Sequence, residues 1–124
     1  MRSIANLRSQ RHIELALHAV AVAWGVEAQA MKSPTRGEHA VALARQVVMY
    51  VAHVALGVPL RQIALSLGRD RATARHACRV IEDLREQPAF DERVRGIESA
   101  LSVIRHEAGL RGTESNGAAM ELSR

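Results

Sequence analysis

The chain has 124 residues, a formal net charge of +4 at pH 7 and a single cysteine, Cys78. A domain of this length buries roughly two-thirds of the surface of its unfolded chain, so it can fold without a disulfide, and one cysteine cannot form one within the chain. The most apolar stretch, residues 16–24, is far too short to cross a bilayer, and the start of the chain lacks the apolar core of a signal peptide. We therefore expect a soluble, cytoplasmic protein with no membrane partner.

The positive charge comes almost entirely from arginine, because Lys32 is the only lysine and the pI is about 10.5. This balance favours a polyanionic partner, although an acidic protein or an anionic membrane surface would also attract it. The aromatic residues Trp24, Tyr50 and Phe90 are too few for a base-stacking platform of the kind that binds single strands. Double-stranded DNA is therefore the favoured polyanion.

Apolar residues recur at helical spacing along most of the chain, and glycine and proline separate the segments. The predicted helices, in chain order, span residues 10–24, 27–31, 38–56, 60–67, 71–86 and 90–106. The helix over residues 38–56 is expected at the centre of the core, and the last helix is expected to turn Val94, Ile97, Leu101 and Ile104 inward. Residues 32–37 are predicted to form a basic loop. The fold class is thus an all-α bundle with one domain, residues 1–107, followed by a disordered tail, residues 108–124.

Residues 60–86 have the layout of a helix-turn-helix, with Gly68 in the turn and Asp70 as the N-cap of the second helix. Ala64 is the small residue where the two helices approach, and apolar residues on both helices hold the pair together. An ordinary helical hairpin gives the same pattern. Periodicity alone therefore does not separate a DNA-binding pair from a merely structural one.

The surface of the second helix favours the DNA-binding interpretation. Arg71, Arg75 and Arg79 stand at i, i+4 and i+8, and we call this set the arginine stripe. Like charges at this spacing repel one another, and a solvated face would mix charges of both signs. An anionic groove removes the conflict, because each arginine can meet a phosphate or a guanine edge. Arg61, on the first helix of the pair, would add a further phosphate contact.

Three segments resemble the C-terminal domain of the bacterial replication initiator DnaA. They are residues 44–52 (ARQVVMYVA), residues 60–63 (LRQI) and residues 68–82 (GRDRATARHACRVIE). In that family an alanine-arginine-glutamine helix precedes a helix-turn-helix, whose recognition helix opens glycine-arginine-aspartate-histidine-threonine-threonine and continues histidine-alanine-cysteine-arginine. The similarity covers about residues 13–101 and implies a stand-alone DnaA-related protein with a bundle of the DnaA or Trp-repressor type.

The resemblance implies a role for each matched residue. Residues expected on the phosphate backbone are Arg45, Gln46, Arg69 and Arg79. Asp70 is expected at a base edge as well as at the helix cap, and Thr73 in the groove. Arg36 falls in the counterpart of the basic loop that enters the adjacent minor groove, where the family has several basic residues and this chain has only two.

The chain departs from the family pattern where the bases are read. Arg71 replaces a histidine, Ala72 replaces a threonine and Arg75 replaces an aliphatic residue, while the turn is one glycine shorter. These changes predict a DNA site related to the family box but not identical with it. A Walker-A loop with its lysine is absent from the 124 residues, so the ATPase of the initiator is not carried over.

The sequence gives no indication of an enzyme, a metal site or a cofactor. Cys78 lies on the apolar side of its helix, where a packed thiol is expected rather than a nucleophile. The six histidines form no i, i+4 pair, and no catalytic triad or metal set can be assembled. We therefore predict no catalytic activity and no small-molecule substrate.

Three functional hypotheses follow. The first is sequence-specific binding of double-stranded DNA at DnaA-box-like sites in the nucleoid, which regulates chromosomal replication initiation or nearby transcription. The second is a DnaA-related protein-interaction module that modulates the initiator or its regulatory ATPase without reading DNA; the changed reading residues favour it and the arginine stripe disfavours it. The third is a transcription factor of the Trp-repressor type, for which no effector pocket is evident.

Overall fold

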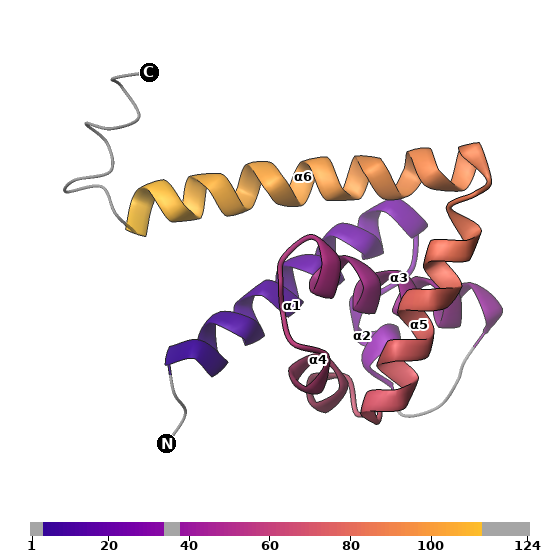
Figure 1. The fold of residues 1–124 in the computed structure, drawn as a ribbon, viewed down its shortest axis with the longest axis horizontal. Helices are drawn as coiled ribbons and strands as arrows, with labels where there is room; N and C mark the ends of the chain where they lie inside the picture. Colours follow the sequence, from indigo (N-terminus) through magenta and orange to yellow (C-terminus); the bar gives the residue numbers. More distant parts are fainter. Residues whose placement is uncertain (1–3, 34–37, 113–124) are drawn as a thin grey trace.

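The computed structural model describes residues 4–33 and 38–112, with side chains as far as residue 104. These residues form six helices and no strand, which confirms the all-α fold class (Figure 1). The helices are α1 (Ile4–Trp24), α2 (Ala28–Lys32), α3 (His39–Val54), α4 (Leu60–Ser66), α5 (Arg71–Leu84) and α6 (Pro88–Gly112). Each corresponds to a predicted helix, and the bounds differ most at the start of α1 and the end of α6.

Helix α3 is the centre of the bundle, as predicted. It packs against each of the other five helices, and all of residues 44–52 are buried except the half-buried Gln46. Valine and alanine dominate this segment, and their small side chains let neighbouring helices approach from several sides. The core therefore surrounds α3, and α5 lies across one of its faces (Figure 1).

The turn between α4 and α5 has the geometry that its sequence predicts. Gly68 adopts φ +67°, a conformation that glycine enters without steric cost. The Arg69 amide donates to the Ala64 carbonyl at 2.8 Å and the Gly68 amide to the Leu65 carbonyl at 3.3 Å, so the last turn of α4 ends in a Schellman motif. Asp70 then caps α5 by accepting a hydrogen bond of 2.8 Å from the Thr73 amide. This confirms the predicted N-cap.

Helix α1 begins at Ile4 rather than at residue 10. Its first turns are held by polar contacts with α4: Gln62 donates to Asn6 at 2.9 Å, and Ser66 donates to Gln10 at 3.4 Å. Contacts made by polar side chains leave no apolar periodicity in the sequence. The predicted helix therefore begins only where the apolar residues do, at residue 10.

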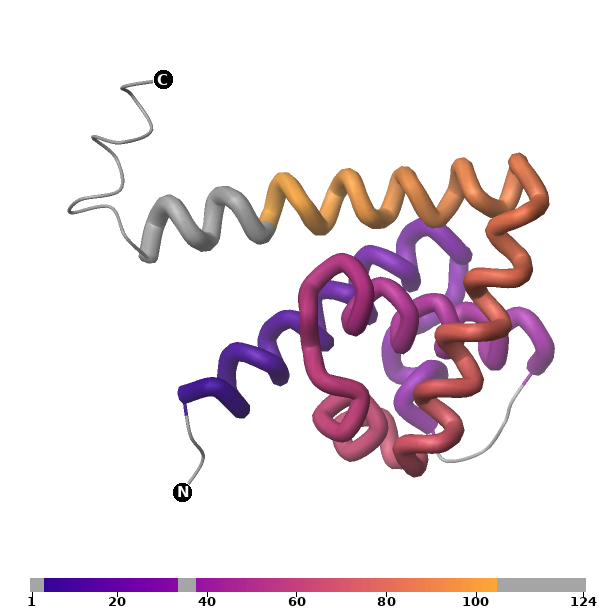
Figure 2. The backbone as a smooth tube through the Cα atoms, in the orientation of Figure 1, coloured from indigo at the N-terminus to yellow at the C-terminus, as the bar shows by residue number. Residues whose placement is uncertain are grey.

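Helix α6 packs across α1 through buried Val94, Ile97 and Leu101. Its first residue is Pro88, which suits the first turn because that position needs no amide donor. The helix continues to Gly112, beyond the predicted end at residue 106, while residues 113–124 of the predicted tail lie outside the described residues. Ile104 was expected inward, and this was wrong: it is 39% exposed, while Leu101, three residues earlier, is buried. Helices α1 and α6 move apart toward the start of α1 (Figure 2), which leaves this part of α6 less covered.

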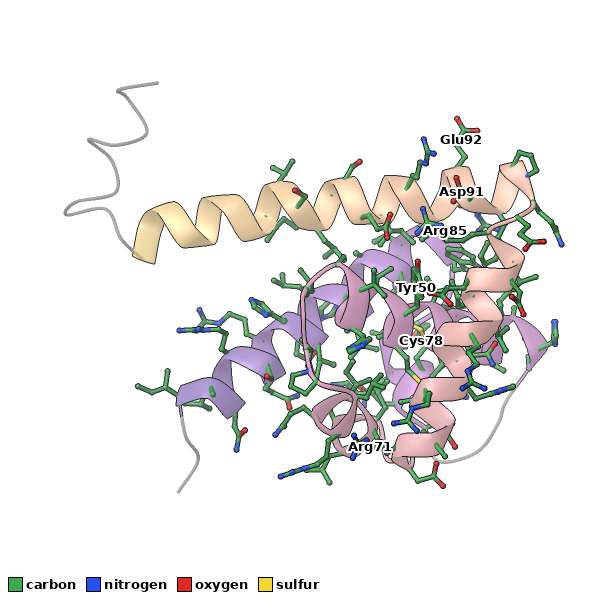
Figure 3. The ribbon with its side chains drawn as sticks, in the orientation of Figure 1. Tyr50, Arg71, Cys78, Arg85, Asp91 and Glu92 are labelled. Carbon is green, nitrogen blue, oxygen red and sulfur yellow. The ribbon has the colours of Figure 1, made fainter. Side chains whose placement is uncertain are left out.

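Arg85 joins the end of α5 to both α3 and α6. Its guanidinium donates to Asp91 at 2.5 Å, to Glu98 at 2.9 Å and to the Tyr50 hydroxyl at 3.1 Å, and it lies 5.7 Å from the centre of the Tyr50 ring. Burial lowers the pKa of Arg85, but hydrogen bonds to Glu98, Asp91 and Tyr50 together raise it above its ordinary value. Figure 3 shows Arg85, Asp91 and Tyr50 gathered at this junction, at the opposite end of α5 from Arg71.

We expect Arg85→Ala to destabilise the fold by roughly 1–3 kcal/mol, because it leaves partly buried carboxylates without their donor. Thermal unfolding followed by circular dichroism measures this. The matched control is Arg95→Ala, which removes the other cation paired with Asp91, at 3.1 Å, from a side chain that is 73% exposed. An exposed ion pair contributes little, so the control should change stability by less than about 0.5 kcal/mol. Equal effects of the two substitutions would contradict this account.

Candidate nucleic-acid interface

Helix α5 has one buried face and one exposed face. Ala74, Ala77 and Ile81 are at most 1% exposed and pack against α3 and α4. All three residues of the arginine stripe are exposed. Burial of the apolar residues leaves the stripe facing outward, since side chains three and four residues apart share a helix face.

The arginine stripe keeps its charge unneutralised within the described structure. None of the five ion pairs formed among residues 4–33 and 38–104 involves it. Arg61 of α4 is also exposed and adds a cation to the same helix pair. Such a surface attracts a polyanion, because phosphates relieve the mutual repulsion of the guanidinium groups.

The first turn of α5 presents the residues that differ from the family pattern. Arg71, Ala72 and Thr73 are all exposed, as is the capping residue Asp70. Hydrogen bonds from the side chain and the amide of Thr73 lower the pKa of Asp70, so this carboxylate stays charged at neutral pH. Asp70 therefore supplies a negative charge, Arg71 a long positively charged side chain and Ala72 a methyl group. They lie at the end of α5 that is farthest from α6 (Figure 3).

Arg45 lies inside the protein, although the resemblance implied a phosphate contact. It is 5% exposed, and its guanidinium donates to the Met31 carbonyl at 2.8 Å and to the Ala30 carbonyl at 3.4 Å. Burial, and then the nearby charge of Arg69, lower the pKa of Arg45. The described geometry gives this arginine a structural role at the end of α2: it donates to the Met31 carbonyl and adds a second donor to the Ala30 carbonyl, which also accepts from the Ser33 amide at 3.2 Å.

Arg69 also bonds to the end of α2. It is half-buried and donates to the Ser33 carbonyl and to the Leu67 carbonyl, each at 3.1 Å. Because Ser33 immediately precedes residues 34–37, the two arginines hold the point where the predicted basic loop begins. Arg36 itself lies outside the described residues.

A groove of about 450 Å³ runs between α3 and α5, and we call it the α3–α5 groove. Its polar lining consists of His39, Arg45, Gln46, Arg69, Thr73 and His76. The structure thus brings together four residues that the resemblance placed at the DNA. His39 and His76 were not among the residues predicted at the DNA. His76 follows Thr73 at i+3 and His39 precedes Gln46 at i−7, so helical spacing could have placed them on the same faces.

Cys78 has the environment of a packed side chain. It is half-buried, and burial together with the charge of Glu82 raises the pKa of its thiol, which opposes formation of the reactive thiolate. In the part of the chain that the structure describes, no group of histidine, cysteine or acidic side chains could hold a metal ion. No described helix is long and apolar enough to span a membrane.

A helix pair joined by a short glycine turn, with a cationic face on its second helix, defines a helix-turn-helix domain of the DNA-binding class. The family described as "Bacterial dnaA protein helix-turn-helix" matches residues 13–81. The chain belongs to this family, and membership implies that the domain is a DNA-binding module rather than a catalytic one. Helix α6 follows the matched region.

Two related proteins carry the same name. The chain is 35% identical over 78 residues to "Chromosomal replication initiator protein DnaA 2" of Chlamydia trachomatis, and equally similar to the protein of that name from Chlamydia muridarum. Each alignment covers 63% of this chain but only 17% of the relative. The chain therefore matches about one-sixth of the length of these initiators.

The burial of Arg45 and the exposure of Arg79 lead to opposite predictions for stability. Arg45→Ala should lower the free energy of unfolding by roughly 1–3 kcal/mol, because the carbonyl groups of Met31 and Ala30 lose a buried donor. Arg79→Ala should leave stability within about 0.5 kcal/mol of wild type. Thermal unfolding of the two variants checks both values. A stable Arg45→Ala protein, or an equal loss in Arg79→Ala, would show that the two arginines are wrongly assigned.

Proposed function

We propose that this protein binds double-stranded DNA at sites related to the DnaA box and thereby regulates chromosomal replication initiation or transcription nearby. The observation that carries the proposal is the arginine stripe, whose charges have no acidic partner among the described residues. On this proposal the protein acts in the nucleoid. Occupancy of the site is the proposed activity of this domain.

If α5 docks in the major groove, its exposed residues would contact different parts of the DNA. The first turn of a recognition helix faces the base edges, so Arg71 and Ala72 would read sequence. Arg75, Arg79 and Arg61 would meet phosphates and set the position of the helix. Asp70 would keep its capping bond to the Thr73 amide while its second oxygen faces the bases.

Arg71 and Ala72 support a site that differs from the family box by about one or two base pairs. An arginine can donate to both O6 and N7 of guanine, whereas the histidine of the family offers a single donor on each ring edge. Ala72 has only a methyl group, which can contact the methyl of thymine but cannot select a hydrogen-bonding base. We therefore expect a guanine opposite Arg71.

Selection from a random duplex library tests this assignment. The wild-type protein should enrich a motif related to the DnaA box with a guanine at the altered position. The double variant Arg71→His with Ala72→Thr restores the residue types of the family and should shift the motif toward the family box. Arg71→Ala should weaken binding to the preferred site by roughly 1–3 kcal/mol and remove discrimination at that base.

Arg79→Ala is the matched control, because loss of a phosphate contact should weaken all duplexes alike and leave the motif unchanged. Identical motifs from wild type and the double variant would show that Arg71 and Ala72 do not read bases. If no duplex is enriched at all, DNA recognition itself is wrong, and the protein-interaction hypothesis takes its place.

A further inference from the structure

The exposed face of α5 changes the sign of its charge along the helix. The arginine stripe ends at Arg79, and Glu82 and Asp83 follow this residue at i+3 and i+4. Helical positions at this spacing share a face, so the two acidic side chains lie in line with the stripe. Both are exposed, and Glu86, in the turn after α5, is exposed as well. We call Glu82, Asp83 and Glu86 the acidic end of α5.

Contacts within the fold do not explain the acidic end. None of its residues takes part in the five ion pairs formed among residues 4–33 and 38–104, and Arg79 pairs with neither of the carboxylates one turn ahead of it. Arg85 donates instead to Asp91 and Glu98. Negative charge in the last turn of a helix is also unfavourable, because it adds to the partial negative charge of the helix C-terminus. The acidic end therefore lacks a stabilising role among the described residues.

The two charged parts of α5 lie at different distances from the base-reading turn. The helix has 14 residues. At about 1.5 Å per residue its length is roughly 20 Å, which exceeds the width of about 12 Å of the major groove. A recognition helix docks with its N-terminal residues at the base edges. Arg71 would therefore enter the groove, while the acidic end, near Arg85 at the other end of α5, would lie outside it (Figure 3).

Non-specific binding does not favour this orientation of α5. It depends on phosphate contacts, and a duplex offers one phosphate charge per about 1.7 Å of its axis, whatever the sequence. A helix laid lengthwise against the phosphates would bring Glu82 and Asp83 close to like charges, which repel them. Helix α6 does not cover this face of α5, because it packs over α1 (Figure 1). The acidic end thus disfavours the lengthwise orientation and leaves the base-reading one unaffected.

We propose that Glu82 and Asp83 are specificity determinants that act by repulsion: they keep phosphates away from the end of α5 and so weaken binding to duplexes without the preferred site. The inference rests on the proposed function, because it requires a protein that binds duplex DNA. Arg71 and Ala72 would strengthen the preferred site, whereas the acidic end weakens all others. Both effects raise the ratio of specific to non-specific affinity.

The experiment compares two duplexes of equal length at the same salt concentration, one with the motif that the wild-type protein selects and one with that motif scrambled. The double variant Glu82→Gln with Asp83→Asn should bind the scrambled duplex at least about fivefold more tightly than wild type does. Its affinity for the selected motif should change by less than about twofold, because the acidic end lies outside the groove there. The specificity ratio therefore falls.

Glu27→Gln with Glu92→Gln is the matched control. It raises the net charge by the same amount, both side chains are exposed, neither lies on α5, and Glu27 makes no side-chain capping bond. Long-range attraction acts on any duplex, so this control should raise both affinities by a common factor and keep the wild-type ratio. The reversal Glu82→Lys with Asp83→Lys should strengthen binding to the scrambled duplex beyond the neutral variant.

Melting curves establish that each variant is folded under the conditions of the titration. Equal changes in the two affinities of the neutral variant, or a ratio that matches the control, would overturn the inference while duplex binding itself stands. Weaker binding of the neutral variant to the selected motif would also overturn it, because the carboxylates would then accept hydrogen bonds from bases. If the wild-type protein binds neither duplex, the proposed function is wrong, and this inference with it.

Discussion

Ala74, Ala77 and Ile81 of α5 lie buried against α3 and α4, and this contact determines which residues of α5 are exposed to solvent. Because positions three and four apart share a helix face, burial of these residues turns the arginine stripe outward. The turn before α5 completes the arrangement, since Gly68 ends α4 and Asp70 starts α5. The bundle thus serves to hold one cationic helix in a fixed orientation.

The arginines of this chain divide into structural and surface residues according to the partners that the fold provides. Arg45 and Arg69 donate to backbone carbonyl groups around the end of α2, and Arg85 donates to two carboxylates and a tyrosine hydroxyl. These interactions fix α2 and α6 around the central helix. The arginine stripe receives no such partner among the described residues, which is why it is the surface that we assign to DNA.

Much of the fold could be predicted because its signals are local. The glycine of the turn, the aspartate cap and the apolar periodicity of α3 each act within a few residues, and all three predictions are confirmed. The position of Arg45 could not be predicted, because it depends on where the carbonyl groups of α2 come to lie. Ile104 shows the same limit: it continues the apolar spacing of Val94, Ile97 and Leu101, but it is exposed because α1 and α6 move apart toward the start of α1. The α3–α5 groove likewise joins residues from two helices that only the tertiary fold brings together.

Genome-wide crosslinking of the protein to chromosomal DNA shows whether the arginine stripe directs it to DnaA-box-like sites. The wild-type protein is compared with a variant in which all three residues of the arginine stripe are alanine, after both have been shown to melt at the same temperature. If the stripe binds such sites, wild-type peaks should fall on DnaA-box-like sequences and disappear in the variant. Peaks unrelated to such sequences, or peaks that the variant retains, would contradict it.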